Sequence, residues 1–298
     1  MSRSGKPSRD ESRVTRHERE NSPHPSPVTH HASRVTRADS ALIIFAKAPI
    51  AGQVKTRLCP PLTPDEAASL HGSFVLDALE RSKTAIAKHR LPLDRSLACA
   101  PSARHVFFKI LEERHGVKLL DQVGEDLGAR MTHACSTVFS SGYKQVLLVG
   151  TDVPSLLLDT YRDALTLLAD HDLVLGPACD GGYYLIGLKR PAPELFADIP
   201  WSTDRVLDLT RQKADRLGFK TGLLPAQRDI DTIDDLLALI EEAGMGREVR
   251  GITPRPSPLA TSLSPRTRDA LELIAQRLRS RLPQSQGKAG TRSMGNPP

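Results

Sequence analysis

Short runs of consecutive apolar residues, each followed by a segment with helical periodicity, constrain the fold of this chain more than any other feature. The clearest runs are ALIIFAKA from Ala41, QVLLVG from Gln145 and DLVLGP from Asp172. An uninterrupted apolar run of this kind is typical of a strand that is covered on both faces. Such strands alternating with helices predict an α/β fold, with a mostly parallel sheet and helices on both faces.

The other segments fit this alternation. Residues 63–66 (Thr-Pro-Asp-Glu) predict a capping box with proline at the first helical position, and the helix that they open should run to about His89. We expect further strands at 96–100, 117–120, 183–188 and 220–224, and further helices at 102–115, 126–140, 156–169, 202–217 and 232–243.

Charge and aromatic residues are distributed unevenly along the 298 residues. Residues 1–40 carry a net charge of +3 and residues 251–298 of +6, whereas residues 41–250 carry −3 and hold all 12 aromatic side chains. Segments that are charged and poor in aromatics cannot bury enough apolar surface to offset the entropy of ordering. We predict one domain over 41–250, a disordered basic tail at 1–40, and a Pro-rich linker followed by the pattern of an amphipathic helix at 251–298.

The composition argues against several classes of protein. The basic tails contain no aromatic residue that could stack on bases, so we expect no specific nucleic acid partner, and the sequence indicates no other partner for them. No apolar run approaches the roughly 20 residues that span a bilayer, and the N-terminus lacks the apolar core of a secretory signal. The four cysteines form no C-x-x-C pair, which predicts reduced thiols and a cytoplasmic location.

The loop after the first apolar strand carries groups that suit phosphates. One glycine (Gly52), one hydroxyl (Thr56) and three cations (Lys47, Lys55 and Arg57) lie between this strand and the next helix. Backbone amides and the planar guanidinium of arginine are good donors to phosphate oxygens. The loop has neither the Walker A pattern nor the dinucleotide-binding glycine pattern. Phosphate binding and an ordinary loop with solvated cations therefore both stay open.

Two carboxylates are candidates for holding a metal ion. Asp152 directly follows the strand at 145–150 in the segment Gly-Thr-Asp-Val-Pro, where a carboxylate could bind Mg²⁺ together with substrate phosphates. The alternative is a turn or a helix N-cap. Asp231 belongs to an acidic cluster ahead of the last predicted helix, where it could join Asp152 on the metal or cap the helix.

The segment Asp180-Gly181-Gly182-Tyr183 lies between two predicted strands. Glycines allow the backbone to approach a ligand closely, and the aspartate could orient a hydroxyl or act as a base. The alternative is a plain hairpin turn, because Asp-Gly is a strong hairpin signal. We expect Lys55, Arg57 and Asp152 to converge near this segment, because ligands bind at the carboxyl ends of the strands in such sheets.

Six segments, in order, resemble the family of small bacterial glycosyltransferases of the GT-A type that was first catalogued as a domain of unknown function, DUF2064. They are LIIFAKAPIAGQVKTRL, GEDLGARM, LLVGTDVPSL, LGPACDGGYYLIGLK, IPWST and DIDTIDDL, and they cover about residues 41–245. Part of the family is named for arsenosugar biosynthesis, and its wider relatives include molybdenum-cofactor and phospholactate nucleotidylyltransferases. The resemblance implies a three-layer GT-A-like fold, as in nucleotide-diphospho-sugar transferases, and a divalent cation, Mg²⁺ or Mn²⁺.

The resemblance also implies roles for individual residues. The positions that match the nucleotide- and phosphate-binding parts of the family are Lys47, Lys55, Arg57, Asp126 and Arg130. Asp152 and Asp231 match the metal-binding acids. Asp180 matches a catalytic carboxylate, and Gly181, Gly182 and Tyr183 match a substrate-binding segment. The family often has Asp where this chain has Ser155, which weakens the case for a second carboxylate beside Asp152.

We therefore predict a metal-dependent transferase that takes a nucleotide-sugar donor and a small-molecule acceptor. The metal on Asp152 and the cations of Lys55 and Arg57 would neutralise the diphosphate as it leaves. Asp180 would take the proton of the acceptor hydroxyl. The same motifs also fit a nucleotidylyltransferase that releases pyrophosphate, although the family name favours glycosyl transfer. A catalytically silent nucleotide-binding module is the third interpretation, and the retained acids Asp152 and Asp231 argue against it.

Overall fold

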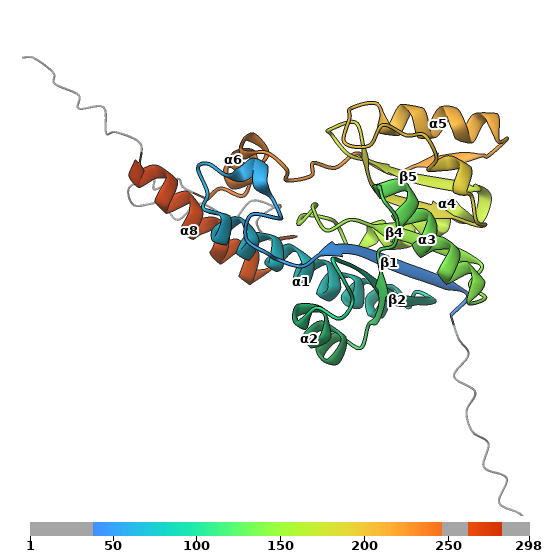
Figure 1. Cartoon of the computed structure of the whole chain (residues 1–298), viewed down its shortest axis with the longest axis horizontal. Coiled ribbons are helices and arrows are strands. Elements are labelled where there is room, and N and C mark those ends of the chain that lie inside the picture. Colours follow the sequence, from blue (N-terminus) through green and yellow to red (C-terminus); the bar gives the residue numbers. More distant parts are fainter. Residues whose placement is uncertain (1–37, 246–261, 282–298) are drawn as a thin grey trace, which may run out of the picture. The chain divides into compact units, whose positions relative to one another are not determined.

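The computed structural model describes residues 38–245 and 262–281 (Figure 1). Most of the predicted basic tail, the linker up to residue 261 and the last 17 residues lie outside the described part of the chain. Among the described residues, no helix is both long enough and apolar enough to cross a bilayer. All four cysteines are free thiols.

The helices and strands follow the expected alternation. The strands are β1 (Ser40–Lys47), β2 (Leu93–Ala100), β3 (Lys118–Asp121), β4 (Gln145–Val149), β5 (Leu173–Pro177), β6 (Tyr183–Leu188) and β7 (Thr221–Leu223). The α-helices are α1 (Pro64–His89), α2 (Val106–His115), α3 (Leu127–Ser140), α4 (Asp159–Asp170), α5 (Val206–Arg216), α6 (Ile233–Glu242) and α8 (Pro265–Arg281). Two short 3₁₀ helices are η1 (Thr56–Leu58) and η2 (Pro193–Leu195).

The described strands form a single sheet of seven in the order β3-β2-β1-β4-β6-β5-β7. All neighbouring pairs are parallel except those of β6, which runs antiparallel to both β4 and β5. The prediction of an α/β fold with a mostly parallel sheet is therefore confirmed. Because β6 returns directly from β5, the turn between them lies at the same edge of the sheet as the carboxyl ends of β1 and β4.

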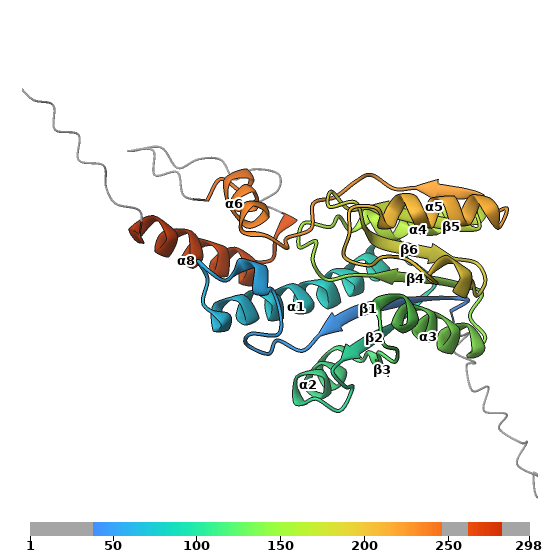
Figure 2. The same cartoon turned by 45° about the horizontal axis from the view of Figure 1, so that its top comes forward.

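Helices cover both faces of the sheet, as Figures 1 and 2 show. Alternate residues of β1 face opposite sides, as the pleat of a strand requires. Leu42 and Ile44 pack in a core with α1, α2 and α4, whereas Ala41 and Ile43 pack in a second core with α3 and α5. This two-sided burial explains why the strand sequences are continuously apolar rather than alternating.

A third core cluster lies beside the sheet, where α8 packs with η1, the first half of α1 and α6 (Figures 1 and 2). The side chains of Leu58, Phe74, Leu236 and Leu271 are all buried in it. The amphipathic pattern near the C-terminus therefore forms a helix whose apolar side chains share a core with the segments around the loop after β1.

Three helices begin three or four residues later than their patterns predict. The helix expected from residue 102 begins at Val106, with His105 as its N-cap. The helix expected from residue 156 begins at Asp159, because Leu156 lies in a turn in which its N–H donates a hydrogen bond to the carbonyl of Val153. The helix expected from residue 202 begins at Val206. Ser202 has φ of 64°, which is incompatible with a right-handed helix at this position. The capping box at Thr63 forms as predicted.

Candidate functional site

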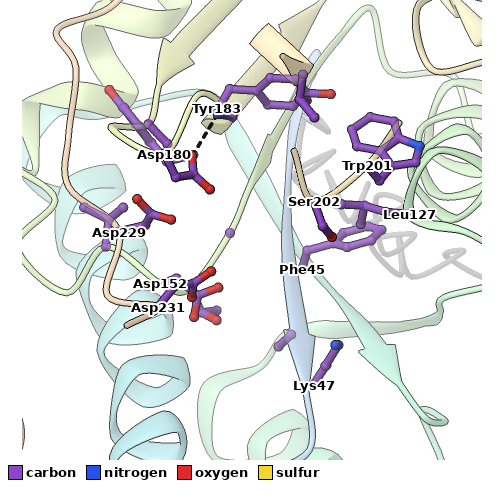
Figure 3. Close-up of a pocket in the computed structure, with 18 of the residues that line it drawn as sticks. Phe45, Lys47, Leu127, Asp152, Asp180, Tyr183, Trp201, Ser202, Asp229 and Asp231 are labelled. Atoms are coloured by element: carbon purple, nitrogen blue, oxygen red, sulfur yellow. Dashed lines mark hydrogen bonds between the residues drawn. The ribbon is translucent and has the colours of Figure 1, made fainter. Parts of the chain in front are cut away.

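A pocket with a volume of about 620 Å³ lies at the edge of the sheet where β1 and β4 end and β6 begins. Its charged lining residues are Lys47, Lys55, Arg57, Arg130, Asp152, Asp180, Asp204, Asp229 and Asp231. Its larger apolar lining residues are Phe45, Val54, Leu127, Met131, Leu148, Val153, Tyr183, Tyr184, Trp201 and Val206. Figure 3 shows Asp152, Asp180, Asp229 and Asp231 on one side of β1 and Phe45, Leu127 and Trp201 on the other. The structure thus brings Lys55, Arg57 and Asp152 together in one pocket, while the roles predicted for them stay predictions.

Lys55 is the most enclosed charged group of the pocket. Its Nζ lies 2.5 Å from Asp152 Oδ1 and 2.8 Å from Asp231 Oδ1, and it donates to the carbonyl of Ile230 at 2.7 Å. The ammonium also lies over the ring of Phe74, 5.9 Å from its centre. Only 5% of the Lys55 side chain is exposed, against 42% for Asp152 and 38% for Asp231. Lys55 is therefore a fixed internal cation between the two acids that the sequence assigned to the metal.

The opposite charges of this cluster favour the ionised forms of one another. Burial by itself lowers the pKa of Lys55, but Asp152 and Asp231 outweigh it and hold that pKa above its usual value. Burial likewise raises the pKa of Asp152, but the charge and the hydrogen bond of Lys55 oppose it most strongly, and the pKa lies below its usual range. Lys55 and Asp152 are consequently both charged at neutral pH.

A second group of acids lies next to this ion pair. Single carboxylate oxygens of Asp180, Asp229 and Asp231 all lie within 4.8 Å of one another. Burial, followed by the nearby charges of Asp180 and Asp231, raises the pKa of Asp229 to about 7. Ionisation of Asp229 is therefore unfavourable, since the described side chains around it do not neutralise its negative charge. A divalent cation would supply the missing charge, since Mg²⁺ and Mn²⁺ prefer oxygen ligands.

The position of Lys55 bears on where a metal could bind. The cation position between Asp152 and Asp231 is taken by the ammonium of Lys55. The group of Asp180, Asp229 and Asp231 lacks such a partner among the described residues, apart from the bond of Asp231 to Lys55. This group is therefore a donor set that could hold a divalent cation, while metal binding by the predicted pair of Asp152 and Asp231 stays a prediction.

Asp229 was not among the residues expected from the sequence. It lies two positions before Asp231, and the side chain between them, Ile230, is 1% exposed. Alternation of two acids around a buried residue places both carboxylates on the same side of an extended segment. That Asp-Ile-Asp spacing was the signal that could have identified Asp229.

The turn between β5 and β6 combines the two interpretations that its sequence left open. It is a hairpin turn, in which the amide of Gly182 donates to Asp180 Oδ1 at 2.8 Å (Figure 3). It also lines the pocket with Asp180, Gly182 and Tyr183, although Gly181 is not a lining residue. Gly181 instead has φ of +88° and lies against Asp204, whose carbonyl oxygen would be 2.1 Å from an added Cβ.

We expect Gly181→Ala to destabilise the protein strongly, because alanine would combine an unfavourable positive φ with a clash against backbone. Gly52→Ala is the matched control, since Gly52 also has positive φ, +76°, but has open space around it. The free energy of unfolding of the control should fall only by the cost of the backbone conformation, about 1 kcal/mol. Chemical denaturation should show a clearly larger loss for Gly181→Ala, and equal losses would contradict the clash.

The other predicted phosphate-binding residues are divided by the structure. Lys47, Thr56, Arg57 and Arg130 line the pocket, whereas Gly52 and Asp126 do not. Asp126 is the N-cap of α3 and accepts the amide of Ala129 at 2.7 Å. The helix-cap alternative for Asp231 is not what the structure shows, because Thr232 is the N-cap of α6 and forms a capping box with Asp235.

His71 is a further lining residue that the sequence did not single out. It lies on α1, is 5% exposed, and its Nε2 is 3.0 Å from the carbonyl of Lys47 at the end of β1. Burial is the main reason why the pKa of His71 is lowered. The ring is therefore neutral at pH 7 and ties the end of β1 to α1 beneath the pocket.

The apolar wall of the pocket is partly aromatic. The rings of Tyr183 and Trp201 meet edge to face, with their centres 6.4 Å apart. Trp201 belongs to the segment IPWST, and its neighbours Ser202 and Thr203 also line the pocket. The pocket thus combines an aromatic wall with a set of charged groups within the same volume.

We expect the stability of the protein to depend on the ionisation of Asp229. Its pKa is raised on folding from 3.8 to about 7, so its contribution is fully present below about pH 4 and is lost progressively as the pH rises from there through about 7. Asp229→Asn should therefore raise the Tm more at pH 8 than at pH 5. After allowance for solvent screening, the gain at pH 8 should be roughly 1–2 kcal/mol relative to pH 5.

The control for this measurement is Asp234→Asn, an exposed acid in the first turn of α6. It should shift the Tm little at either pH. Thermal unfolding of the three proteins without metal tests the expectation, and a pH-independent effect of Asp229→Asn would contradict it.

Comparison with known proteins agrees with the class that the fold and pocket define, the GT-A-like nucleotide-diphospho-sugar transferase fold. A crystal structure from Desulfovibrio desulfuricans G20, described as a candidate nucleotide-diphospho-sugar transferase, is 32% identical to the chain, with a TM-score of 0.64. The match covers 80% of the present chain and 98% of the other. The model of the family described as "Uncharacterized protein conserved in bacteria (DUF2064)" matches residues 84–203. The chain belongs to this family.

More distant structures are also similar. A cytidylyltransferase from Leptospira borgpetersenii is 15% identical over 81% of this chain and 95% of its own, with a TM-score of 0.43. Glucosyl-3-phosphoglycerate synthase from Mycobacterium tuberculosis, solved with Mn²⁺ and uridine diphosphate, is 10% identical over 72% and 83%, with a TM-score of 0.42. Similarity at this level assigns neither a substrate nor a metal to the present chain. No curated protein is similar enough to be matched.

Proposed function

We propose that the protein is a metal-dependent transferase that acts on a nucleotide-activated donor, and that the reaction is glycosyl transfer from a nucleotide-diphospho-sugar. The observation that carries the proposal is the combination, in one pocket, of exposed cations with a group of three carboxylates, of which only Asp231 has a cationic partner among the described residues. An anionic diphosphate needs the cations, and a divalent cation between the diphosphate and the protein needs the carboxylates.

The diphosphate would lie against the loop after β1. Lys47 and Arg57 are exposed at the pocket, and neither forms an ion pair with another described residue. They are therefore free to contact phosphate oxygens, which the buried Lys55 is not. Lys55 would contribute its charge from beneath, through Asp152 and Asp231. This differs from the sequence-based expectation, in which Lys55 itself contacted the phosphates.

The metal would be held by Asp229 and Asp231. A divalent cation bound there would act as a Lewis acid that stabilises the negative charge of the leaving diphosphate. The role predicted for Asp152 as a metal ligand remains a prediction, and its ion pair with Lys55 supports a role in fixing that lysine.

Asp180 would accept the proton of the acceptor hydroxyl. It is the most exposed of the three acids. One of its oxygens is occupied by the amide of Gly182, which fixes the carboxylate and leaves the other oxygen available. The acceptor would then lie near Tyr183, between the acids and the aromatic wall. The identity of the sugar and of the acceptor is a separate question for the substrate screen.

A thermal-shift screen with Mn²⁺ or Mg²⁺ and a panel of nucleotide sugars and nucleoside triphosphates tests this function. A ligand at about 100 times its Kd should stabilise the protein by about 2.7 kcal/mol, which is a rise in Tm of roughly 5–11 °C for a domain of this size. Stabilising compounds are then assayed for turnover.

The product identifies the reaction. Release of a nucleoside diphosphate from a nucleotide sugar supports glycosyl transfer. Release of pyrophosphate from a triphosphate indicates nucleotidyl transfer instead, which uses the same diphosphate cradle. Binding without turnover of any donor, in the presence of metal and acceptor mixtures, contradicts the proposal and indicates a nucleotide-binding module.

A further inference from the structure

We propose that the C-terminal segment 262–281, here called the brace, is a positioning element of the candidate site. It consists of α8 and the three residues that precede it, and it lies far in sequence from the family match at 84–203. The brace contacts each of the three segments that carry the buried ion pair of Lys55, directly or through one arginine. These contacts are observed in the structure, whereas their effect on ligand binding rests on the proposed function.

The first contact is with the loop after β1. Lys55 is followed at once by η1, whose Leu58 is fully buried in the same cluster as Leu271 of the brace. Arg277 of the brace donates to the carbonyl of Pro61 at 3.2 Å and pairs with Glu66 at 2.8 Å. The brace therefore packs against the segment that places Lys55 under the pocket.

The second contact is with the segment of Asp229 and Asp231. Ile230, the buried residue between these two acids, belongs to the same core cluster as Leu271 and Ile274 of the brace. The carbonyl of Ile230 accepts a hydrogen bond from Lys55 at 2.7 Å. A shift of the brace would thus displace the backbone that carries both acids.

The third contact reaches the Asp152 loop through Arg81 of α1. The guanidinium of Arg81 donates to the carbonyls of Pro154 and Leu156, which follow Asp152, and to the carbonyl of Ser262 at the start of the brace. One side chain therefore joins the loop after β4 to the beginning of the brace.

A buried polar anchor sets the register of the brace on α1. Asp77 of α1 is 2% exposed. It accepts a hydrogen bond from the hydroxyl of Thr267 at 2.7 Å and pairs with Arg266 at 3.2 Å. A buried carboxylate is costly unless it is satisfied, so this anchor favours one position of α8 over shifted alternatives.

The brace is separate from the two cores that hold the sheet. The described core clusters on the two faces of the sheet contain no residue of α8. Loosening the brace should therefore disturb the segments of Lys55, Asp152 and Asp231 more than the sheet. A residue that only contributed general stability would have no such selectivity.

The test compares variants of the full-length protein by hydrogen exchange and by titration with Mn²⁺. Leu271→Ala removes a fully buried brace side chain, and Leu195→Ala removes an equally buried leucine of η2 from the core on the far side. At a temperature where both proteins are folded, Leu271→Ala should raise amide exchange at 54–62, 152–156 and 229–232, and Leu195→Ala should not. Mn²⁺ binding should weaken by about tenfold or more in Leu271→Ala only.

A second pair of variants, which should be less destabilising, tests the same point if Leu271→Ala does not fold. Thr267→Val removes the hydroxyl that binds Asp77, whereas Thr267→Ser keeps it. The valine variant should raise exchange in the same three segments, and the serine variant should restore protection. The proposal is overturned if brace variants whose Tm has fallen as far as that of Leu195→Ala show unchanged amide exchange in these three segments. If the wild type binds no Mn²⁺, the proposed function fails, but the exchange data still decide the role of the brace.

Discussion

Lys55→Met is expected to destabilise the protein by about 3 kcal/mol, the low end of the cost of breaking a buried ion pair. The variant keeps the length of the side chain but removes the charge that lies 2.5 Å from Asp152 and 2.8 Å from Asp231. Both carboxylates would then repel one another without a cation between them. They are partly exposed, so water relieves some of the cost. Chemical denaturation at pH 7 measures the loss.

Lys47→Met is the matched control for this measurement. Lys47 lines the same pocket but is exposed, so its replacement should change stability by less than about 0.5 kcal/mol. Adding Asp152→Asn to Lys55→Met should recover part of the loss, because one of the two facing charges is removed. Equal stability of Lys55→Met and wild type would mean that the lysine is not the cation that holds these acids together.

Asp231→Asn is expected to reduce turnover with the donor found in the screen by at least about 100-fold, the upper end of the typical contribution of a group around a bound metal. Asp231 is the one acid that belongs both to the ion pair of Lys55 and to the group of three carboxylates. Asparagine preserves its shape but removes the charge that attracts a hard cation. The affinity for Mn²⁺, measured by titration, should fall together with turnover.

Helix capping does not complicate this result. Thr232 and Asp235 cap α6, so the helix keeps its N-terminal hydrogen bonds when Asp231 is replaced. Asp234→Asn, three positions along the chain and exposed, serves as the control and should keep both turnover and metal affinity. A fully active Asp231→Asn protein with unchanged Mn²⁺ affinity would remove Asp231 from the metal site.

The candidate site illustrates how far local patterns reach. The expectation that loops at the carboxyl ends of the strands meet in one place held for Lys55, Arg57 and Asp152, because the direction of parallel strands is implied by their helical connections. Asp126 and Gly52 lie outside the pocket lining, and the phosphate-binding roles predicted for them stay predictions. Asp126 has a complete structural explanation as a helix cap.

The sequence by itself determined the alternation of strands and helices, the two-sided burial of the sheet and the capping of α1, because these follow from the periodicity and short-range chemistry of neighbouring residues. Only the tertiary structure decided that Lys55 lies between Asp152 and Asp231, although it is 176 residues from the latter. The tertiary structure also decided that β6 inserts antiparallel into the sheet and that α8 packs beside the site. The physical reason is that burial and the distance between charges depend on which distant segments pack together, and the pattern along one segment does not specify its neighbour.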